Sequence, residues 1–173
     1  MKNSNKLSTS KPNKRIRRRF IPFFEKLYKI RSRLGELVVN QVKIQVLLKG
    51  LIIVRKASKG FLNKENKKWI EWLNNKTLGE LIFVYRGYSK IGEENFIKQL
   101  ENFNKTRNKL MHKINFYQGP VALSLGKNID FKELKNEIID VNSSAKDLIV
   151  NLEKLIGNEI QYIVELNKKY QNQ

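Results

Sequence analysis

The sequence predicts an all-α protein, a four- to five-helix bundle with a basic, partly disordered N-terminal arm. Apolar residues recur with the 3.6-residue period of an amphipathic helix over several long stretches. Capping residues precede two of these stretches, and no pair of alternating segments is joined by a hairpin turn. The length of 173 residues suits one domain with a tail and a substantial core.

The first predicted helix is long and runs from Phe23 to about Lys56, because its apolar residues follow one helical face. The stretch Val46–Val54 is rich enough in β-branched residues that a local strand is an alternative there. Gly60 is the expected stop signal. A second, shorter helix is expected from about Lys64 to Asn75. Its buried side consists of Trp69, Ile70, Trp72 and Leu73.

The third and fourth helices follow closely. Thr77 and Glu80 have the spacing of a capping box, so a helix is expected from there to about Gly87. The fourth helix is expected from Glu93 to about Asn115 and has the most regular apolar stripe of the chain. This stripe consists of Phe96, Leu100, Phe103, Leu110, Met111 and Ile114.

The last predicted helix begins after a loop that is marked by Gly119-Pro120 and Gly126. Asp130 with Glu133 caps this helix, and its apolar period continues to about Leu166. The polar segment 142–144 predicts a break and Gly157 a bend, as alternatives to one continuous helix.

The composition excludes several classes of site. The chain has no cysteine, which rules out a cysteine nucleophile, a cysteine-based zinc or iron–sulfur site and disulfide bonds. It has a single histidine, so a site with two imidazoles requires a second copy of the chain. No carboxylate cluster or cofactor motif is evident, and we expect neither a metal nor a cofactor.

Positive charge is concentrated in the N-terminal part. The chain has 35 Lys and Arg against 16 Asp and Glu, for a net charge of +19, and residues 1–68 contain 20 basic and 3 acidic residues of these totals. Residues 1–19 are expected to form a flexible arm that precedes an all-α domain over 20–173, because the arm has little apolar sequence with which to offset its ordering. Such arms bind nucleic acid through phosphates. The expected contacts are Lys14, Arg15, Arg17, Arg18 and Arg19.

Two other roles for the arm stay open at this point. It can be a solvated tail that aids solubility, or it can bind a membrane surface together with the apolar segment Phe20–Phe24 that follows it. The apolar segment 37–54 contains five Asn, Gln and Lys side chains, too many for a bilayer span. We therefore expect a soluble cytoplasmic protein that has no membrane partner.

One constellation of residues, on the fourth helix, carries chemistry. On a helical wheel, Arg107 falls in the middle of the apolar stripe. Asn108 and His112 flank this stripe on one side, one turn apart. Because an unpaired guanidinium is costly to bury, an anionic group or a water-filled seam is expected to face Arg107.

Three explanations for Arg107 compete. In the first, it pairs with a carboxylate of a neighbouring helix, for example in 130–165, and His112 is an ordinary surface residue. In the second, Arg107 lies at a subunit interface. In the third, the two residues handle phosphate, since a guanidinium binds a phosphoryl group bidentately and an imidazole transfers protons near neutral pH.

The segment Thr106–His112 resembles the signature of the HEPN superfamily: Arg, a polar residue that is often Asn, three more residues and His, on a late helix of an all-α bundle. The resemblance covers this motif closely and the helices of residues 80–150 loosely, and it does not extend to the basic N-terminal part. It implies a metal-independent endoribonuclease of the kind found in toxin–antitoxin, abortive-infection and RNA-guided CRISPR systems. It also implies a homodimer in which two Arg/His sets line one groove.

The same resemblance implies a role for each residue. One His112 takes the proton from a ribose 2′-OH, Arg107 stabilises the charge that develops at phosphorus, and Asn108 orients the phosphate or the histidine. The His112 of the second copy protonates the leaving 5′-oxygen, and the products carry 2′,3′-cyclic phosphate ends. Lys109 and Lys113, on the same helix, are expected to add phosphate contacts.

The sequence departs from one branch of that superfamily. Toxins that a nucleotidyltransferase antitoxin silences carry a modified Tyr two residues after the His, and Ile114 stands there in this chain. The basic arm favours stable binding of RNA instead, either a substrate or a dedicated non-coding RNA, and an antitoxin is a further expected partner. The leading hypothesis is a dimeric ribonuclease of a bacterial antiphage defence or toxin system. The alternatives are a non-catalytic RNA-binding or ribosome-associated protein and a helical adaptor whose arm meets an acidic partner.

Overall fold

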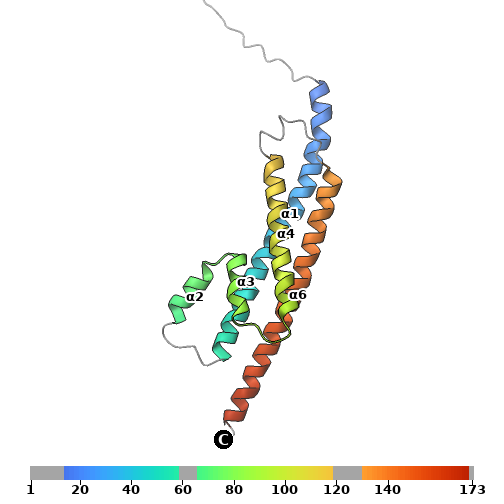
Figure 1. Ribbon diagram of the computed structural model, residues 1–173. Helices are drawn as coiled ribbons and strands as arrows, with labels where there is room; N and C mark the ends of the chain where they lie inside the picture. Colours follow the sequence, from blue (N-terminus) through green and yellow to red (C-terminus); the bar gives the residue numbers. More distant parts are fainter. Residues whose placement is uncertain (1–13, 59–65, 119–129, 172–173) are drawn as a thin grey trace, which may run out of the picture.

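The computed structural model describes residues 14–58, 66–118 and 130–171, and every regular element in these ranges is an α-helix (Figure 1). The predicted all-α fold is confirmed. The helices are α1 (Lys14–Ser58), α2 (Asn66–Asn74), α3 (Leu78–Arg86), α4 (Glu94–Gln118) and α6 (Phe131–Gln171).

The long helices form the body of the molecule. In Figure 1, α1 and α6 lie side by side and run in the same direction, and α4 runs against them in the opposite direction. The short helices α2 and α3 cover the C-terminal end of α1. The core lies between the three long helices, and its fully buried members include Leu37 and Ile44 of α1, Leu100 of α4 and Ile138 of α6.

Helix α1 begins earlier than the apolar period predicted. Its first residue is Lys14 rather than Phe23, so the basic run 14–19 forms its first turns instead of belonging to a separate arm. Arg and Lys are good helix formers, and this run extends the amphipathic helix that follows it. Residues 1–13 of the expected arm lie outside the described residues, as does Gly60.

The β-branched stretch Val46–Val54 is helical, so the alternative of a local strand is wrong. Leu48, Leu51 and Ile52 are fully buried on one face of α1, which is the pattern of a helix that packs on one side. Burial against α6 and α3 thus outweighs the modest cost of β-branched residues in a helix.

Helix α3 begins at the predicted capping box. The Thr77 hydroxyl accepts a hydrogen bond from the backbone N–H of Glu80, and the Glu80 carboxylate accepts one from the backbone N–H of Thr77 at 2.8 Å. Lys76 adds an ion pair to the same carboxylate at 2.9 Å. The helix ends at Gly87, as expected from the sequence.

The capping box makes the stability of the fold depend on pH. The backbone hydrogen bond from Thr77, together with hydrogen bonds from Lys76 and the Thr77 side chain, lowers the pKa of Glu80 from 4.5 to about 2. Because the folded pKa lies below the unfolded value, this stabilisation is present above pH 4.5 and is lost as the pH falls towards 2. In urea unfolding, the stability difference between the wild type and Glu80→Gln is expected to be constant above pH 6 and to shrink between pH 4.5 and 2. A difference that does not change with pH would contradict this prediction.

Helix α6 is capped by Asp130, as expected, because its Oδ1 accepts hydrogen bonds from the backbone N–H groups of Lys132 and Glu133. The expected break at 142–144 and bend at Gly157 do not occur, and the helix continues past Leu166 to Gln171. The reason is that the buried Asn142 side chain finds partners on α1. It donates to the carbonyl of Arg33 and accepts from Asn40, both at 3.1 Å. The loop with Gly119, Pro120 and Gly126 lies outside the described residues.

A buried ionic cluster joins α1 to the turn before α4 and to α6. Arg55 is only 2% exposed, and its guanidinium donates to Glu93 at 2.5 and 2.7 Å and to Glu159 at 3.1 Å. Burial disfavours the charge, but the hydrogen bonds to Glu93 and the nearby carboxylates raise the pKa of Arg55 above its ordinary value. Likewise burial opposes ionisation of Glu93, and the bonds from Arg55 and Tyr85 lower its pKa nonetheless. Arg55, Glu93 and Glu159 thus form a buried ionic cluster that connects three separate parts of the fold.

The composition of α1 bears on the membrane question. The segment Tyr28–Ser58 is long and apolar enough to cross a membrane by length and composition alone, a property that it shares with core helices of soluble proteins. Its polar residues therefore do not exclude a span in the way the sequence suggested. In this fold, the inner face of the segment contributes to the core and includes the paired Arg55.

Candidate functional site

The candidate residues lie on α4 (Figure 1), beyond Glu101, Asn104 and Lys105, which line a cleft against α3. The inner stripe of α4 packs into the bundle as predicted, with Leu100, Phe103, Leu110 and Ile114 buried. Arg107 belongs to this stripe and is partly buried, so the sequence placed it correctly.

Arg107 has no carboxylate partner among the described residues. Its Nη1 donates a hydrogen bond to Oδ1 of the adjacent Asn108 at 2.8 Å, and burial lowers its pKa. Arg55, by contrast, is compensated by two carboxylates. The ion pair that one explanation predicted for Arg107 is therefore not found in residues 14–58, 66–118 and 130–171. A neutral amide compensates a desolvated cation only in part, so the site favours binding of an external anion.

His112 is exposed on the surface of α4. It lies about 140° around the helix from Arg107, as the 100° step per residue dictates. Asn108 lies between them, one turn before His112, with its amide oxygen already bound to Arg107. Within one chain, Arg107 therefore contacts Asn108, but the side chains of Arg107 and His112 project in different directions.

The two lysines expected to contact phosphate behave differently. Lys109 is exposed. Lys113 forms ion pairs with Glu133 at 3.1 Å and Glu137 at 2.8 Å on α6, and the bond to Glu137 is the main cause of its raised pKa. Lys113 is therefore already paired within the single chain, and its contact with phosphate stays a prediction.

Sequence reasoning missed two lysines on the same helix. Lys98 and Lys105 are exposed and have no ion pair within the described ranges. Together with Lys109 and His112 they follow spacings of seven, four and three residues, which places them on one outward side of α4. We call these four residues the α4 basic face. Their spacing was visible in the sequence and was the available signal.

A shallow cleft of about 270 Å³ between α3 and α4 adjoins the α4 basic face. Its lining includes Lys105, together with Arg86 and Glu101, which form an ion pair with each other. Phe83 lies on it with 76% of its surface exposed. Exposed aromatic rings beside cations are the groups on which unpaired nucleobases stack. The cleft therefore adds an aromatic contact to the electrostatic ones.

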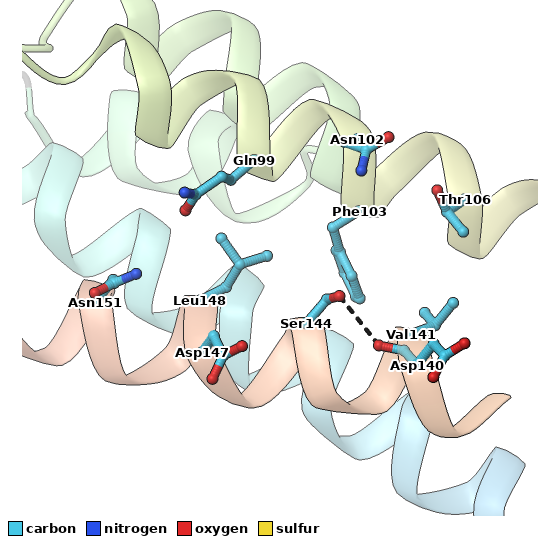
Figure 2. A pocket seen from close by; sticks show the side chains of 10 residues that line it. All are labelled: Gln99, Asn102, Phe103, Thr106, Asp140, Val141, Ser144, Asp147, Leu148 and Asn151. Carbon is cyan, nitrogen blue, oxygen red and sulfur yellow. Dashed lines mark hydrogen bonds between the residues drawn. The ribbon is translucent and has the colours of Figure 1, made fainter. Parts of the chain in front are cut away.

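A second cleft of about 320 Å³ lies between α4 and α6 (Figure 2). Figure 2 shows that Asp140 of α6 lies across from Thr106 of α4, that Asp147 lies nearer Gln99, and that Phe103 and Leu148 form the apolar part of the cleft. Two carboxylates disfavour an anion, and this cleft faces α6 whereas His112 lies on another side of α4. It is therefore not the anion site.

For the other expected nucleic-acid contacts, the structure gives the position of the backbone only. Lys14, Arg15, Arg17, Arg18 and Arg19 lie in the first turns of α1. Throughout the described part of the chain, no group of three or more His, Asp and Glu residues is arranged to hold a metal ion.

Comparisons of the chain with models of protein families, with curated proteins and with solved structures find no match. The chemistry of α4 is therefore the basis for a functional assignment.

Proposed function

We propose that the protein is a metal-independent endoribonuclease that cleaves RNA as a homodimer through Arg107 and His112, in a bacterial antiphage defence or toxin system. The observation that carries this proposal is the partly buried Arg107, whose side chain has one hydrogen bond among the described residues, to the neutral side chain of Asn108. The assignment to defence systems rests on the HEPN-like motif.

The surroundings of Arg107 support binding of a polyanion. The α4 basic face presents Lys98, Lys105 and Lys109 beside His112, and the basic run of α1 adds positive charge at one end of the molecule. Phosphate contacts of this kind supply most of the affinity of a protein for nucleic acid. The exposed Phe83 provides a stacking surface for an unpaired base.

The chemistry follows from the residue types. A neutral imidazole of His112 accepts the 2′-OH proton, the 2′-oxygen attacks the adjacent phosphorus, and Arg107 stabilises the added negative charge. The bond to the 5′-oxygen then breaks, and an imidazolium protonates this leaving group. Because Arg107 and His112 point to different sides of one helix, two chains are needed to surround one phosphate. No step requires a metal.

The second candidate is a non-catalytic RNA-binding protein, which the high charge alone favours. Both candidates bind RNA backbone, so binding and its salt dependence do not separate them. Cleavage does, because only the ribonuclease needs the imidazole.

His112→Ala is expected to reduce the rate of RNA cleavage by about 10²- to 10⁴-fold, since it removes general acid–base catalysis. RNA affinity is expected to stay within about twofold, because one exposed imidazole adds little to many phosphate contacts. The assay uses the purified full chain at neutral pH with a chelator present, and it identifies 2′,3′-cyclic phosphate ends on the products.

Asn95→Ala is the matched control, because Asn95 is exposed in the first turn of α4, 17 residues before His112. It is expected to cleave at the wild-type rate. If the wild type leaves RNA intact with chelator present, or if His112→Ala cleaves as fast as the wild type, the protein is an RNA-binding protein and the ribonuclease proposal is wrong.

A further inference from the structure

The outer face of α1 carries an exposed apolar stripe. Its large members are Tyr28, Val39, Val42 and Val46, which are 76%, 66%, 52% and 60% exposed. The small residues Ser32 and Gly35 complete it. We call these six residues the α1 stripe. The outer face of a surface helix is normally polar, so exposed apolar side chains aligned along it indicate a partner.

The spacing of the α1 stripe is that of a helix–helix seam. Its residues follow one another at alternating intervals of four and three, so that each position recurs after seven residues, as in a heptad repeat. The buried residues Ile30, Leu37 and Ile44 repeat every seven positions on the opposite side of the helix. Helix α1 thus has two apolar seams, and the bundle uses only the inner one.

We propose that the α1 stripe pairs with the α1 stripe of a second copy of this chain, in antiparallel orientation. The distribution of charge determines this orientation. Residues 14–33 contain nine Lys and Arg and one acid, so a parallel pair would place two such segments side by side. An antiparallel pair separates them by several times the Debye length of about 8 Å.

The residues that flank the α1 stripe suit the same pairing. Glu36 and Lys43 both border it on the side of α6, seven residues apart and with opposite charge. In an antiparallel pair centred between Val39 and Val42, Glu36 of each copy lies opposite Lys43 of the other copy. Gly35 has nothing within 4 Å of the position of a Cβ atom, which lets the two helices approach closely.

The same flanks argue against a lipid surface as the occupant. Glu36 pairs with Lys146 and Lys43 pairs with Glu153, both at 2.8 Å, and these four charges lie beside the stripe. Insertion into lipid would desolvate them, whereas a second helix offers them opposite charges. The stripe ends after Val46, because the next position of its spacing is Lys49. The Lys49 ammonium donates a hydrogen bond to the carbonyl of Asn74 in α2 at 2.8 Å.

This pairing is independent of the ribonuclease proposal. The α1 stripe lies on α1 facing away from the bundle, and His112 lies on the outward side of α4, so the two surfaces do not share residues. A pair formed through α1 leaves the α4 basic face of each copy open to RNA.

Val42→Lys is expected to raise the dissociation constant of the α1 pair by more than about tenfold, because two lysines would meet at its centre. Sedimentation equilibrium of the purified, nucleic-acid-free full chain measures the mass, which is expected to halve. Circular dichroism checks that the variant folds, as expected for a position that is half exposed in the single chain.

Ile91→Lys is the matched control, because Ile91 is fully exposed in the turn before α4 and is expected to keep the wild-type mass. A monomeric wild type, or a Val42→Lys variant of unchanged mass, would overturn the pairing. So would a monomer that sediments with anionic phospholipid vesicles in a Val42-dependent way, since the stripe would then bind lipid.

Disulfide crosslinking tests the orientation of the two α1 helices. The chain has no native cysteine, so only the introduced cysteines can form disulfides. In the antiparallel pair the two copies of residue 28 lie at opposite ends, so Tyr28→Cys is expected to give no intermolecular disulfide on mild oxidation. The double variant Val39→Cys/Val42→Cys is expected to crosslink the two copies. A disulfide through Tyr28→Cys alone would make the pair parallel and refute the proposed orientation.

Discussion

Arg55→Ala is expected to lower the free energy of unfolding by about 3–5 kcal/mol, the cost of breaking a buried ion pair from one side. The variant leaves Glu93 and Glu159 without their shared cation, and Glu159 is only 3% exposed. One oxygen of Glu159 already has no hydrogen-bond partner among the described groups. Lys90 still reaches the other oxygen at 2.6 Å, which keeps the loss within this range.

Urea denaturation followed by circular dichroism measures this change. Arg86→Ala is the control, because Arg86 pairs with Glu101 on the surface and such pairs contribute less than about 1 kcal/mol. If Arg55→Ala proves too unstable to fold, Glu159→Gln removes a charge and keeps the shape. A loss for Arg55→Ala no larger than that for Arg86→Ala would show that the cluster does not stabilise the fold.

Arg107→Met is expected to have the opposite effect on stability. It removes a partly buried guanidinium whose one partner in the described part of the chain is Asn108, and it places an apolar side chain in an apolar stripe. The free energy of unfolding is expected to rise by about 1 kcal/mol. The rate of RNA cleavage is expected to fall by about 10²-fold or more, because the charge developing at phosphorus loses its stabilising cation.

The same urea and cleavage assays measure both changes. Arg107→Lys is the control that keeps the charge: cleavage is expected to stay low, since an ammonium does not bind phosphate bidentately, and the gain in stability is expected to disappear. If Arg107→Met loses as much stability as Arg55→Ala, Arg107 is a structural residue and not an anion-binding one.

The starts of α3 and α6 could be predicted because their chemistry is local. The capping box of Thr77 and Glu80 and the cap at Asp130 each involve residues within three positions of one another. The apolar periods of α4 and α6 were equally visible. These features determine the all-α fold class without knowledge of the tertiary contacts.

Features that depend on distant partners could not be predicted. Arg55 meets Glu93 and Glu159, 38 and 104 residues away, and the only sequence signal was its position in phase with the buried Leu48 of α1. Asn142 was expected to break α6. The local sequence does not show its hydrogen-bond partners, Arg33 and Asn40, because they are on α1. Lys113 looked free because Glu137 is on another helix.

The candidate site was predicted in part. The position of Arg107 within the apolar stripe followed from periodicity alone. Periodicity did not predict that Arg107 has no carboxylate partner among the described residues, because this depends on which residues of α1 and α6 lie opposite Arg107. The catalytic roles of Arg107 and His112 stay predictions, and the cleavage assay decides them.

The parallel arrangement of α1 and α6 has a consequence for synthesis of the protein. Helix α1 contacts α6 more extensively than any other helix, yet α6 is synthesised after the other described helices. Until α6 has been synthesised, Leu37 and Ile44 of α1 have no lasting cover. The bundle therefore completes its folding only once α6 has left the ribosome.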